Sequence, residues 1–71
     1  MINLRDDILK NQIAYYNGLI AKHSQNVEIY LYQPVGIGEH SDFMGTIDGE
    51  INVIAQAHEK IEIINHYFLN R

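Results

Sequence analysis

The side chains with the widest chemical capacity gather in residues 33–42, which read Gln-Pro-Val-Gly-Ile-Gly-Glu-His-Ser-Asp. Glycines and a hydroxyl just before a helix start can present backbone N–H groups to an anion. Glu39, His40 and Asp42 could instead bind a divalent metal or act as an acid–base pair. However, the lysine and glycine spacing of a phosphate-binding loop are absent, and the two carboxylates would repel a phosphate. We therefore interpret the segment as a connecting turn, with Ser41 as the N-cap of the helix that follows.

This turn is also the segment best placed for recognition, because it would lie exposed at one end of a helical protein. The proline disfavours helical geometry at the residue before it, and the nearby glycines permit positive φ. The residues predicted to form this interaction turn are Pro34, Gly36, Gly38, Glu39, His40 and Asp42.

A second candidate is a row of metal-binding side chains, His58, Glu62 and His66, spaced four residues apart. This spacing puts the three along one face of a helix, and two imidazoles with a carboxylate are a zinc ligand set. His58, however, falls in a row of apolar residues, where a packed and hydrogen-bonded histidine is more common. We therefore predict no metal site and keep these three residues as the candidate ligands.

Two of the histidines, His23 and His58, occupy positions of the apolar rows described below. A protonated imidazole buried in such a seam would be costly. This placement predicts that acidification through about pH 6 loosens the assembly, because the imidazole titrates near that pH.

The composition argues against catalysis. The chain contains no cysteine, which removes thiol nucleophiles, disulfides and thiolate metal sites together. It also has no nucleophile motif and no convergent acid–base set on rigid elements. We therefore predict that the protein is not an enzyme and that it needs no cofactor.

Two rows of apolar residues flank the turn and recur at alternating spacings of four and three, a period typical of helices that pack along one seam. They predict an all-α fold, an antiparallel two-helix hairpin (about 3–32 and 42–69) joined by the Pro/Gly turn. Counting outward from a turn near residue 37, Ile20 would face Ile54, and Ile13 would face Ile61. The first row contains Leu9, Ile13, Tyr16, Ile20, His23, Val27 and Tyr30, and the second contains Met44, Ile47, Ile51, Ile54, His58, Ile61 and Phe68.

An α-β-β-β-α arrangement is the alternative fold. Residues 27–32, Val-Glu-Ile-Tyr-Leu-Tyr, are rich in β-branched and aromatic side chains. Asp48-Gly49, between two apolar stretches, is typical of a two-residue β-hairpin. The strands would be short, however, and the hairpin of helices is the favoured fold.

Chain length bears on the oligomeric state. The 71 residues, 46% of them hydrophobic, form a single domain, 1–71, and a chain this short buries only about 60% of its unfolded surface. A two-helix hairpin covers one strip per helix, so the remaining apolar residues would stay exposed. We predict a homo-oligomer, most simply a dimer that forms a helical bundle. The residues assigned to its interface are Ile8, Tyr15, Leu19, Val53, Ile64 and Tyr67.

The charge excludes two classes of partner. The net charge is -4, and the five Lys and Arg residues form no cluster, whereas nucleic acids and anionic membranes require clustered basic residues. The longest apolar run, Ile29–Tyr32, is far below the roughly 20 residues that span a bilayer. The first residues are acidic where a secretory signal would be basic. We expect a protein of the cytosol, or of a particle assembled there, with no nucleic-acid or membrane partner.

The turn Pro34-Val-Gly-Ile-Gly-Glu-His-Ser-Asp42, followed by Ile47-Asp48 and by Ile54-Ala-Gln-Ala-His-Glu-Lys60, resembles a group of short uncharacterised proteins. Large tailed bacteriophages, including marine and cyanobacterial ones, encode these proteins. The resemblance covers roughly residues 27–68, and the turn is its specific part. It implies a protein of the host cytosol or of the virion, and it implies no catalytic residues.

These observations together favour a small helical oligomer that acts by protein–protein contact, as a phage accessory factor or minor structural component, with an unknown protein partner. The alternative is an oligomer that sequesters a nucleotide or other small molecule between subunits. Tyr30, Tyr32 and the glycine turn would then line the pocket, with tyrosines stacking on bases.

Overall fold

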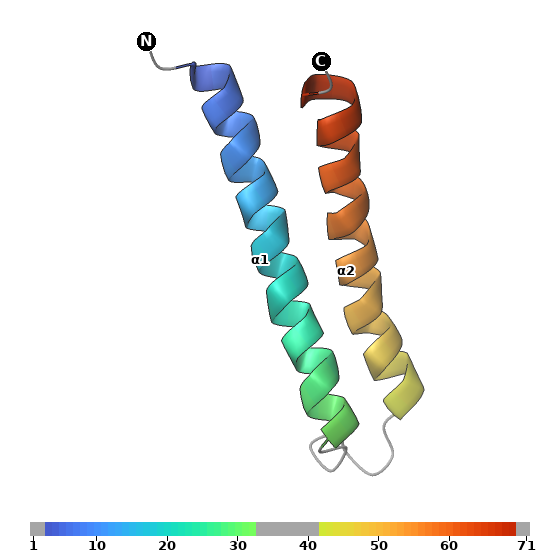
Figure 1. Cartoon of the computed structure of the whole chain (residues 1–71). Helices are drawn as coiled ribbons and strands as arrows, with labels where there is room; N and C mark the ends of the chain where they lie inside the picture. Colours follow the sequence, from blue (N-terminus) through green and yellow to red (C-terminus); the bar gives the residue numbers. More distant parts are fainter. Residues whose placement is uncertain (1–2, 33–41, 70–71) are drawn as a thin grey trace.

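The computed structural model describes residues 3–32 and 42–69, which form two long helices lying side by side in opposite directions (Figure 1). Helix α1 is Leu4–Tyr32, and α2 is Phe43–Ile64, which continues into a π-helical turn, η2 (Asn65–Leu69). The predicted all-α hairpin is therefore confirmed. The α-β-β-β-α alternative is wrong, because the described residues contain no strand. Burial of the apolar rows at a helical period overrides the local β propensity of residues 27–32.

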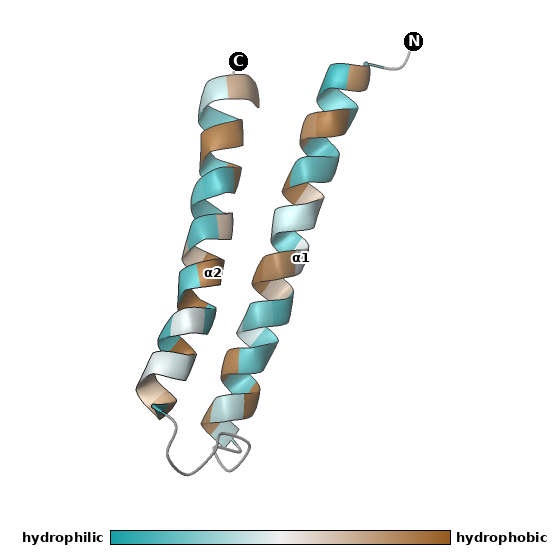
Figure 2. Cartoon of the chain, turned by 180° about the vertical axis from the view of Figure 1, so that it is seen from behind, coloured by the Kyte–Doolittle hydropathy of each residue, from teal (hydrophilic) through white to brown (hydrophobic). Residues whose placement is uncertain are grey.

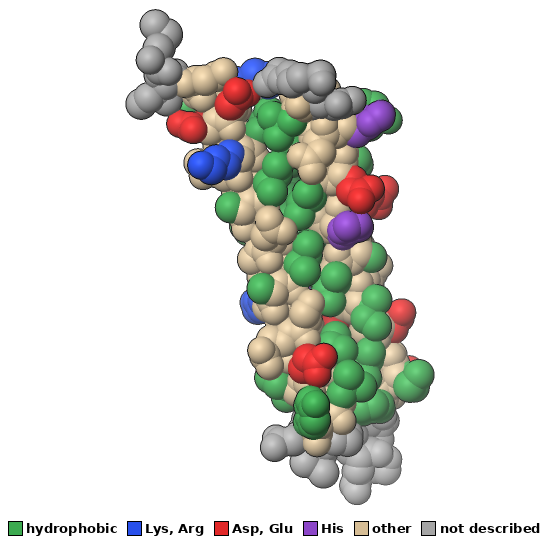
Figure 3. All heavy atoms as spheres, in the orientation of Figure 1, with side chains coloured by type: hydrophobic (Ala, Val, Ile, Leu, Met, Phe, Trp, Pro, Cys, Tyr) green, Lys and Arg blue, Asp and Glu red, His purple; other side chains and the backbone are tan. Residues whose placement is uncertain are grey.

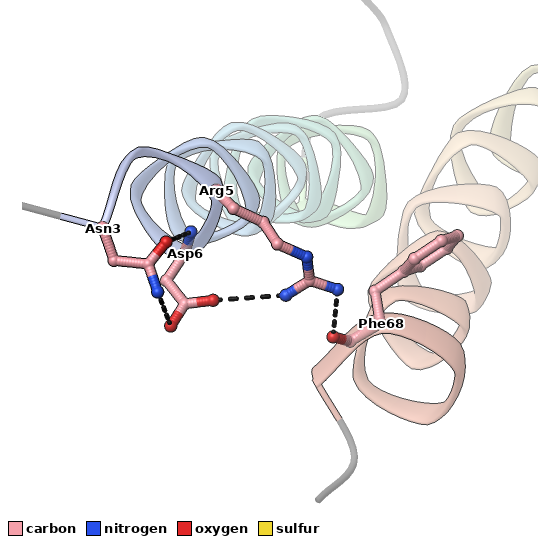
Figure 4. Close-up of polar contacts among 4 residues, drawn as sticks. All are labelled: Asn3, Arg5, Asp6 and Phe68. Carbon is pink, nitrogen blue, oxygen red and sulfur yellow. Dashed lines mark hydrogen bonds and ion pairs between the residues drawn. The ribbon is translucent and has the colours of Figure 1, made fainter.

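Helix α1 begins at a cap formed by Asn3 (Figure 4). The Asn3 side-chain oxygen accepts the backbone N–H of Asp6 at 3.2 Å, and the Asn3 amide donates to the Asp6 carboxylate at 3.1 Å. The Asn3 carbonyl accepts the N–H of Asp7 at 3.0 Å. These bonds satisfy donors that have no partner inside the helix, and the two acidic residues of the first turn interact favourably with the helix dipole.

Helix α2 begins at an Asp42 N-cap, one residue later than the serine that the sequence suggested. The Asp42 carboxylate accepts the Gly45 N–H at 2.9 Å, and the Asp42 carbonyl accepts the Thr46 N–H at 2.9 Å and its hydroxyl at 3.0 Å. A Cβ at Gly45 would collide with the Asp42 carboxylate, whose Cγ would lie 2.9 Å away. Aspartate caps this position well, because its negative charge also interacts favourably with the positive N-terminal end of the helix dipole.

Contacts between the helices fix their register. Arg5 of α1 donates to the Phe68 carbonyl of η2 at 2.8 Å (Figure 4) and so satisfies one of the free carbonyls at the helix end. The Lys60 ammonium lies 5.6 Å from the centre of the Tyr16 ring, within range of a cation–π interaction. These pairs agree with the register that a turn centred near residue 37 predicts.

The core of the hairpin is a thin seam. Among the described residues, Ala57 (2% exposed) and Ile64 (8%) are the buried ones. Around them runs a half-buried strip in which residues seven apart repeat, as in a coiled coil. We call its middle the central row: Leu9, Tyr16, His23 and Tyr30 on α1, with Phe43, Glu50, Ala57 and Ile64 on α2. The row predicted for α1 is half-buried throughout, as expected.

The row predicted for α2 is wrong in part. Met44, Ile51, His58 and Phe68 are exposed, whereas Ala57 and the isoleucine at 64 face α1. Apolar residues of α2 fall on more than one strip of the helix, so the spacing pattern did not distinguish the strip that packs from the strip beside it. Small Ala57 allows close approach of the two helices, and this favours the strip that contains it.

The molecule is elongated rather than compact. Its principal extents are 56 × 20 × 14 Å, and its radius of gyration is 16.2 Å, against about 11 Å for a compact domain of this length. Hydrophobic residues recur along both helices when the hairpin is seen from behind (Figure 2). Many of the large ones are exposed, including Leu4, Tyr32 and Met44. A single chain therefore leaves much of its apolar surface in water.

Candidate functional site

A polar cluster of three side chains interrupts the apolar seam near its middle. The ring nitrogen Nδ1 of His23 on α1 is hydrogen-bonded to Oε2 of Glu50 on α2. The Asn26 amide donates to the other carboxylate oxygen, Oε1, at 3.1 Å. The side chains of His23 and Glu50 are 19% and 16% exposed, so the cluster is shielded on most sides by the two helices. Both oxygens of the carboxylate are thus held by α1.

These partners lower the pKa of Glu50 below its usual value of 4.5. The hydrogen bond from His23 is the largest cause, and partial burial opposes it. The Asn26 amide and the charges of His23 and Lys22 lower the pKa further. The ionised carboxylate is therefore the form that the folded hairpin stabilises.

The cluster can hold the two helices in register, because both oxygens of the Glu50 carboxylate on α2 are bonded to side chains of α1. A single polar pair within an apolar seam is known to specify helix register, because sliding would leave its members without partners. Sequence reasoning placed His23 in the seam correctly but missed Glu50 and Asn26. Glu50 could have been found as a polar residue seven positions before Ala57 in the central row.

The candidate metal ligands are not assembled into a site. His58 Nε2 lies 3.1 Å from Glu62 Oε1, and both side chains are largely exposed, at 68% and 70%. The His66 ring instead packs edge-on against Tyr67, with ring centres 4.7 Å apart. Within residues 3–32 and 42–69, no group of three His, Asp or Glu side chains could hold a metal ion. His58 therefore belongs to the surface rather than to the seam, contrary to the sequence-based expectation.

Most of the predicted interaction turn cannot be placed. Pro34, Gly36, Gly38, Glu39 and His40 lie outside the described residues. The remaining member is Asp42, whose carboxylate caps α2 through Gly45. That carboxylate already accepts the hydrogen bond that caps the first turn of α2.

The predicted oligomer interface is exposed in part. Ile8, Tyr15 and Tyr67 are exposed, Leu19 and Val53 are half-buried, and Ile64 is buried inside the hairpin. The assignment of Ile64 to the oligomer interface is therefore wrong, because its side chain is covered within the hairpin and cannot contact a second subunit. The three exposed members remain available for contact with another chain.

A shallow hollow of about 450 Å³ lies on the outer side of α1 near its C-terminal end, lined by Gln25, Glu28, Ile29 and Tyr32. Tyr32 thus borders a concave surface, as the ligand-binding alternative requires. Tyr30 is half-buried and is not among these lining residues.

In comparisons with known proteins, no family model, no curated protein and no solved structure matches the chain. Among the described helices, none is both long enough and apolar enough to cross a membrane. The function must therefore be inferred from the surfaces and contacts of this chain itself.

Proposed function

We propose that this protein is a non-enzymatic helical module that works by self-association and by contact with another protein. The observation that carries the proposal is the amount of apolar surface that the hairpin leaves uncovered. Eleven large hydrophobic side chains of the described helices are exposed, whereas two residues are buried. Exposed apolar patches of this kind mark interaction surfaces in soluble proteins.

The area of the molecule supports the same proposal. The chain exposes 5614 Å², whereas a compact monomer of 8.2 kDa exposes about 4,500 Å². The additional area that this chain exposes is of the same order as the roughly 800 Å² that each partner buries in a protein–protein interface of standard size. A second copy packed against the hairpin would form a bundle of helices and would remove this excess.

The setting of this role comes from the resemblance to short proteins of large tailed bacteriophages. In that setting the module is an accessory factor or a minor structural component, in the host cytosol or in the virion. The acidic balance of the chain, -4, favours a protein partner over a nucleic acid.

Sedimentation equilibrium on the purified chain tests self-association. We expect a mass that is a multiple of 8.2 kDa at micromolar concentration, with a melting temperature that rises with protein concentration. Ile8→Glu should shift the mass toward the monomer. Asn11→Glu adds the same charge at an exposed polar position of the same helix and should leave it unchanged. A folded monomer across the whole concentration range would refute the proposal.

The hollow beside Tyr32 favours a second candidate function, the sequestering of a small molecule. A thermal-shift screen with cyclic nucleotides tests it, because a ligand that binds the folded form raises the melting temperature. A rise that Tyr32→Ala abolishes would support this function. No shift at millimolar nucleotide would refute it.

A further inference from the structure

The two broad faces of the hairpin can be told apart by helix geometry. Both helices are right-handed and run in opposite directions, so a residue one position after the central row lies on the same side of the hairpin in each. We call this side, which Figure 3 shows, the front face. Residues one position before the central row form the back face. The front face includes Lys10, Leu31, Met44, Ile51 and His58, and the back face includes Ile8, Tyr15, Lys22, Ile29 and Ile63.

Each face carries an exposed apolar patch, and the two patches lie toward opposite ends of the molecule; Ile29 is exposed on the back face as well, but near the ends that the turn joins. The front patch consists of Leu31, Met44 and Ile51, near the ends of the helices that the turn joins. Figure 3 shows hydrophobic side chains along the middle of this face that spread over α2 toward that end. The back patch lies toward the chain termini and consists of Ile8, Tyr15, Ile63 and Tyr67.

The two faces also differ in charge. Glu28, Asp48 and Glu62 each follow a half-buried residue and therefore lie on the front side, where Lys10 is the one basic residue among those described. Lys22 and Lys60 each precede a half-buried residue and therefore lie on the back side. Among the described acidic residues, Asp42 has that backward position, because it directly precedes Phe43 of the central row, and its carboxylate caps α2. The front thus carries mainly acidic residues, and the back carries more basic residues than acidic ones.

From this arrangement we propose that the back patch of one copy docks on the front patch of a second copy. The inference rests on the proposed self-association and adds its geometry. Pairing front with front would bring carboxylates together, and pairing back with back would bring lysines together, whereas front with back joins opposite charges. A symmetric dimer would also cover one patch and leave the other exposed. A front-to-back contact covers both.

Such a contact is heterologous, because two different surfaces meet. The growing assembly then always has one free front at one end and one free back at the other. Growth therefore continues until a ring closes or a filament forms. Because the patches lie toward opposite ends, successive copies either run in the same direction and are staggered along the 56 Å length of the hairpin, or run in opposite directions and lie level with each other. The assembly is a chain of hairpins rather than a closed pair.

Complementation between two damaged variants tests this geometry. Met44→Glu with Ile51→Glu blocks the front, and Ile8→Glu with Tyr15→Glu blocks the back; all four positions are exposed, so the hairpin can still fold. Each variant alone should sediment as a monomer. An equimolar mixture should form a 1:1 dimer and nothing larger, because one intact front meets one intact back.

The outcomes are distinct. If either variant alone still forms a homodimer, or if the mixture stays monomeric while the wild type associates, the front-to-back contact is overturned. If the wild type itself is monomeric, the proposed function fails as well. Circular dichroism confirms that each variant is helical, and the same substitutions to Gln replace any variant that is not.

Charge reversal supplies an independent arm. Lys22→Glu on the back should raise the dissociation constant for self-association several-fold above that of the wild type. The difference should shrink at high salt. Lys10→Glu makes the same charge reversal on the front side of the same helix and should not weaken association. Equal weakening by both variants would overturn the proposed pairing of faces.

Discussion

Replacing Glu50 by Gln tests whether the interhelical cluster stabilises the hairpin. The substitution keeps the shape of the side chain but removes the charge that His23 and Asn26 hold. A hydrogen bond to a charged group contributes about 1.5–3 kcal/mol. Because the Glu50 side chain is 16% exposed, solvent weakens the interaction, and we expect a loss of about 1–2 kcal/mol at pH 7. Chemical denaturation at one fixed protein concentration measures it.

The pH dependence of this loss has a defined sign. The pKa of Glu50 is lowered below 4.5 in the folded state, so its contribution is present above the unfolded pKa and is lost as pH falls through the folded one. The wild type should therefore lose its advantage over Glu50→Gln progressively as the pH falls below about 4.5. The loosening expected near pH 6 rested on histidines buried in the seam without partners, whereas His23 is hydrogen-bonded to Glu50 and His58 is exposed.

Glu62→Gln is the matched control, because Glu62 also pairs with a histidine but in an exposed position. An exposed pair contributes about 0–1 kcal/mol, so this variant should change stability little. The reasoning is refuted if the two variants lose the same stability at pH 7. It is equally refuted if the gap between wild type and Glu50→Gln is unchanged at pH 2.

Three further predictions concern packing and caps. Ile64→Ala should cost about 2–4 kcal/mol because it empties a buried position, whereas the exposed neighbour Ile63→Ala should cost less than about 1 kcal/mol in the monomer; urea titration compares them. Asp42→Ala should cost about 0.5–2 kcal/mol and reduce the helical signal in circular dichroism, and Asp42→Asn should recover most of it. Gly18→Ala should raise the free energy of unfolding by about 0.5–1 kcal/mol because its Cβ meets open space, whereas Gly45→Ala should lower it by displacing the cap.

The sequence was sufficient to predict the fold because both helices carry long periodic rows. On α1 the row read from the sequence is the one that packs, and Leu9, Tyr16 and Val27 are half-buried as expected, although apolar residues such as Ile8 and Tyr15 lie outside it. On α2 the isoleucines spread over two adjacent strips, so the period was clear but its phase was not. Packing against α1 decided the phase, and a pattern read along one helix contains no information about the other.

The polar cluster was harder to predict for the same reason. Glu50 reads as an ordinary surface carboxylate until α1 supplies His23 and Asn26 beside it. Its meaning depends on the register of two segments that are far apart in the chain. The candidate metal ligands illustrate the same point, because spacing on one helix aligned His58 with Glu62 but brought no third described ligand toward them.

A hairpin with so little buried surface still gives two positions of its seam, His23 and Glu50, to a polar pair. Apolar residues there would add burial, but they would also let the helices slide past each other by a turn, about 5.4 Å, at little cost. Sliding would separate Ile8 from Tyr67 and would dismantle the back patch. The polar pair prevents this, because any other register leaves a carboxylate without its partners. The polar pair thus lowers the stability of the single chain but defines its surface. Burial of that surface against a second copy can supply the apolar burial that the seam does not provide.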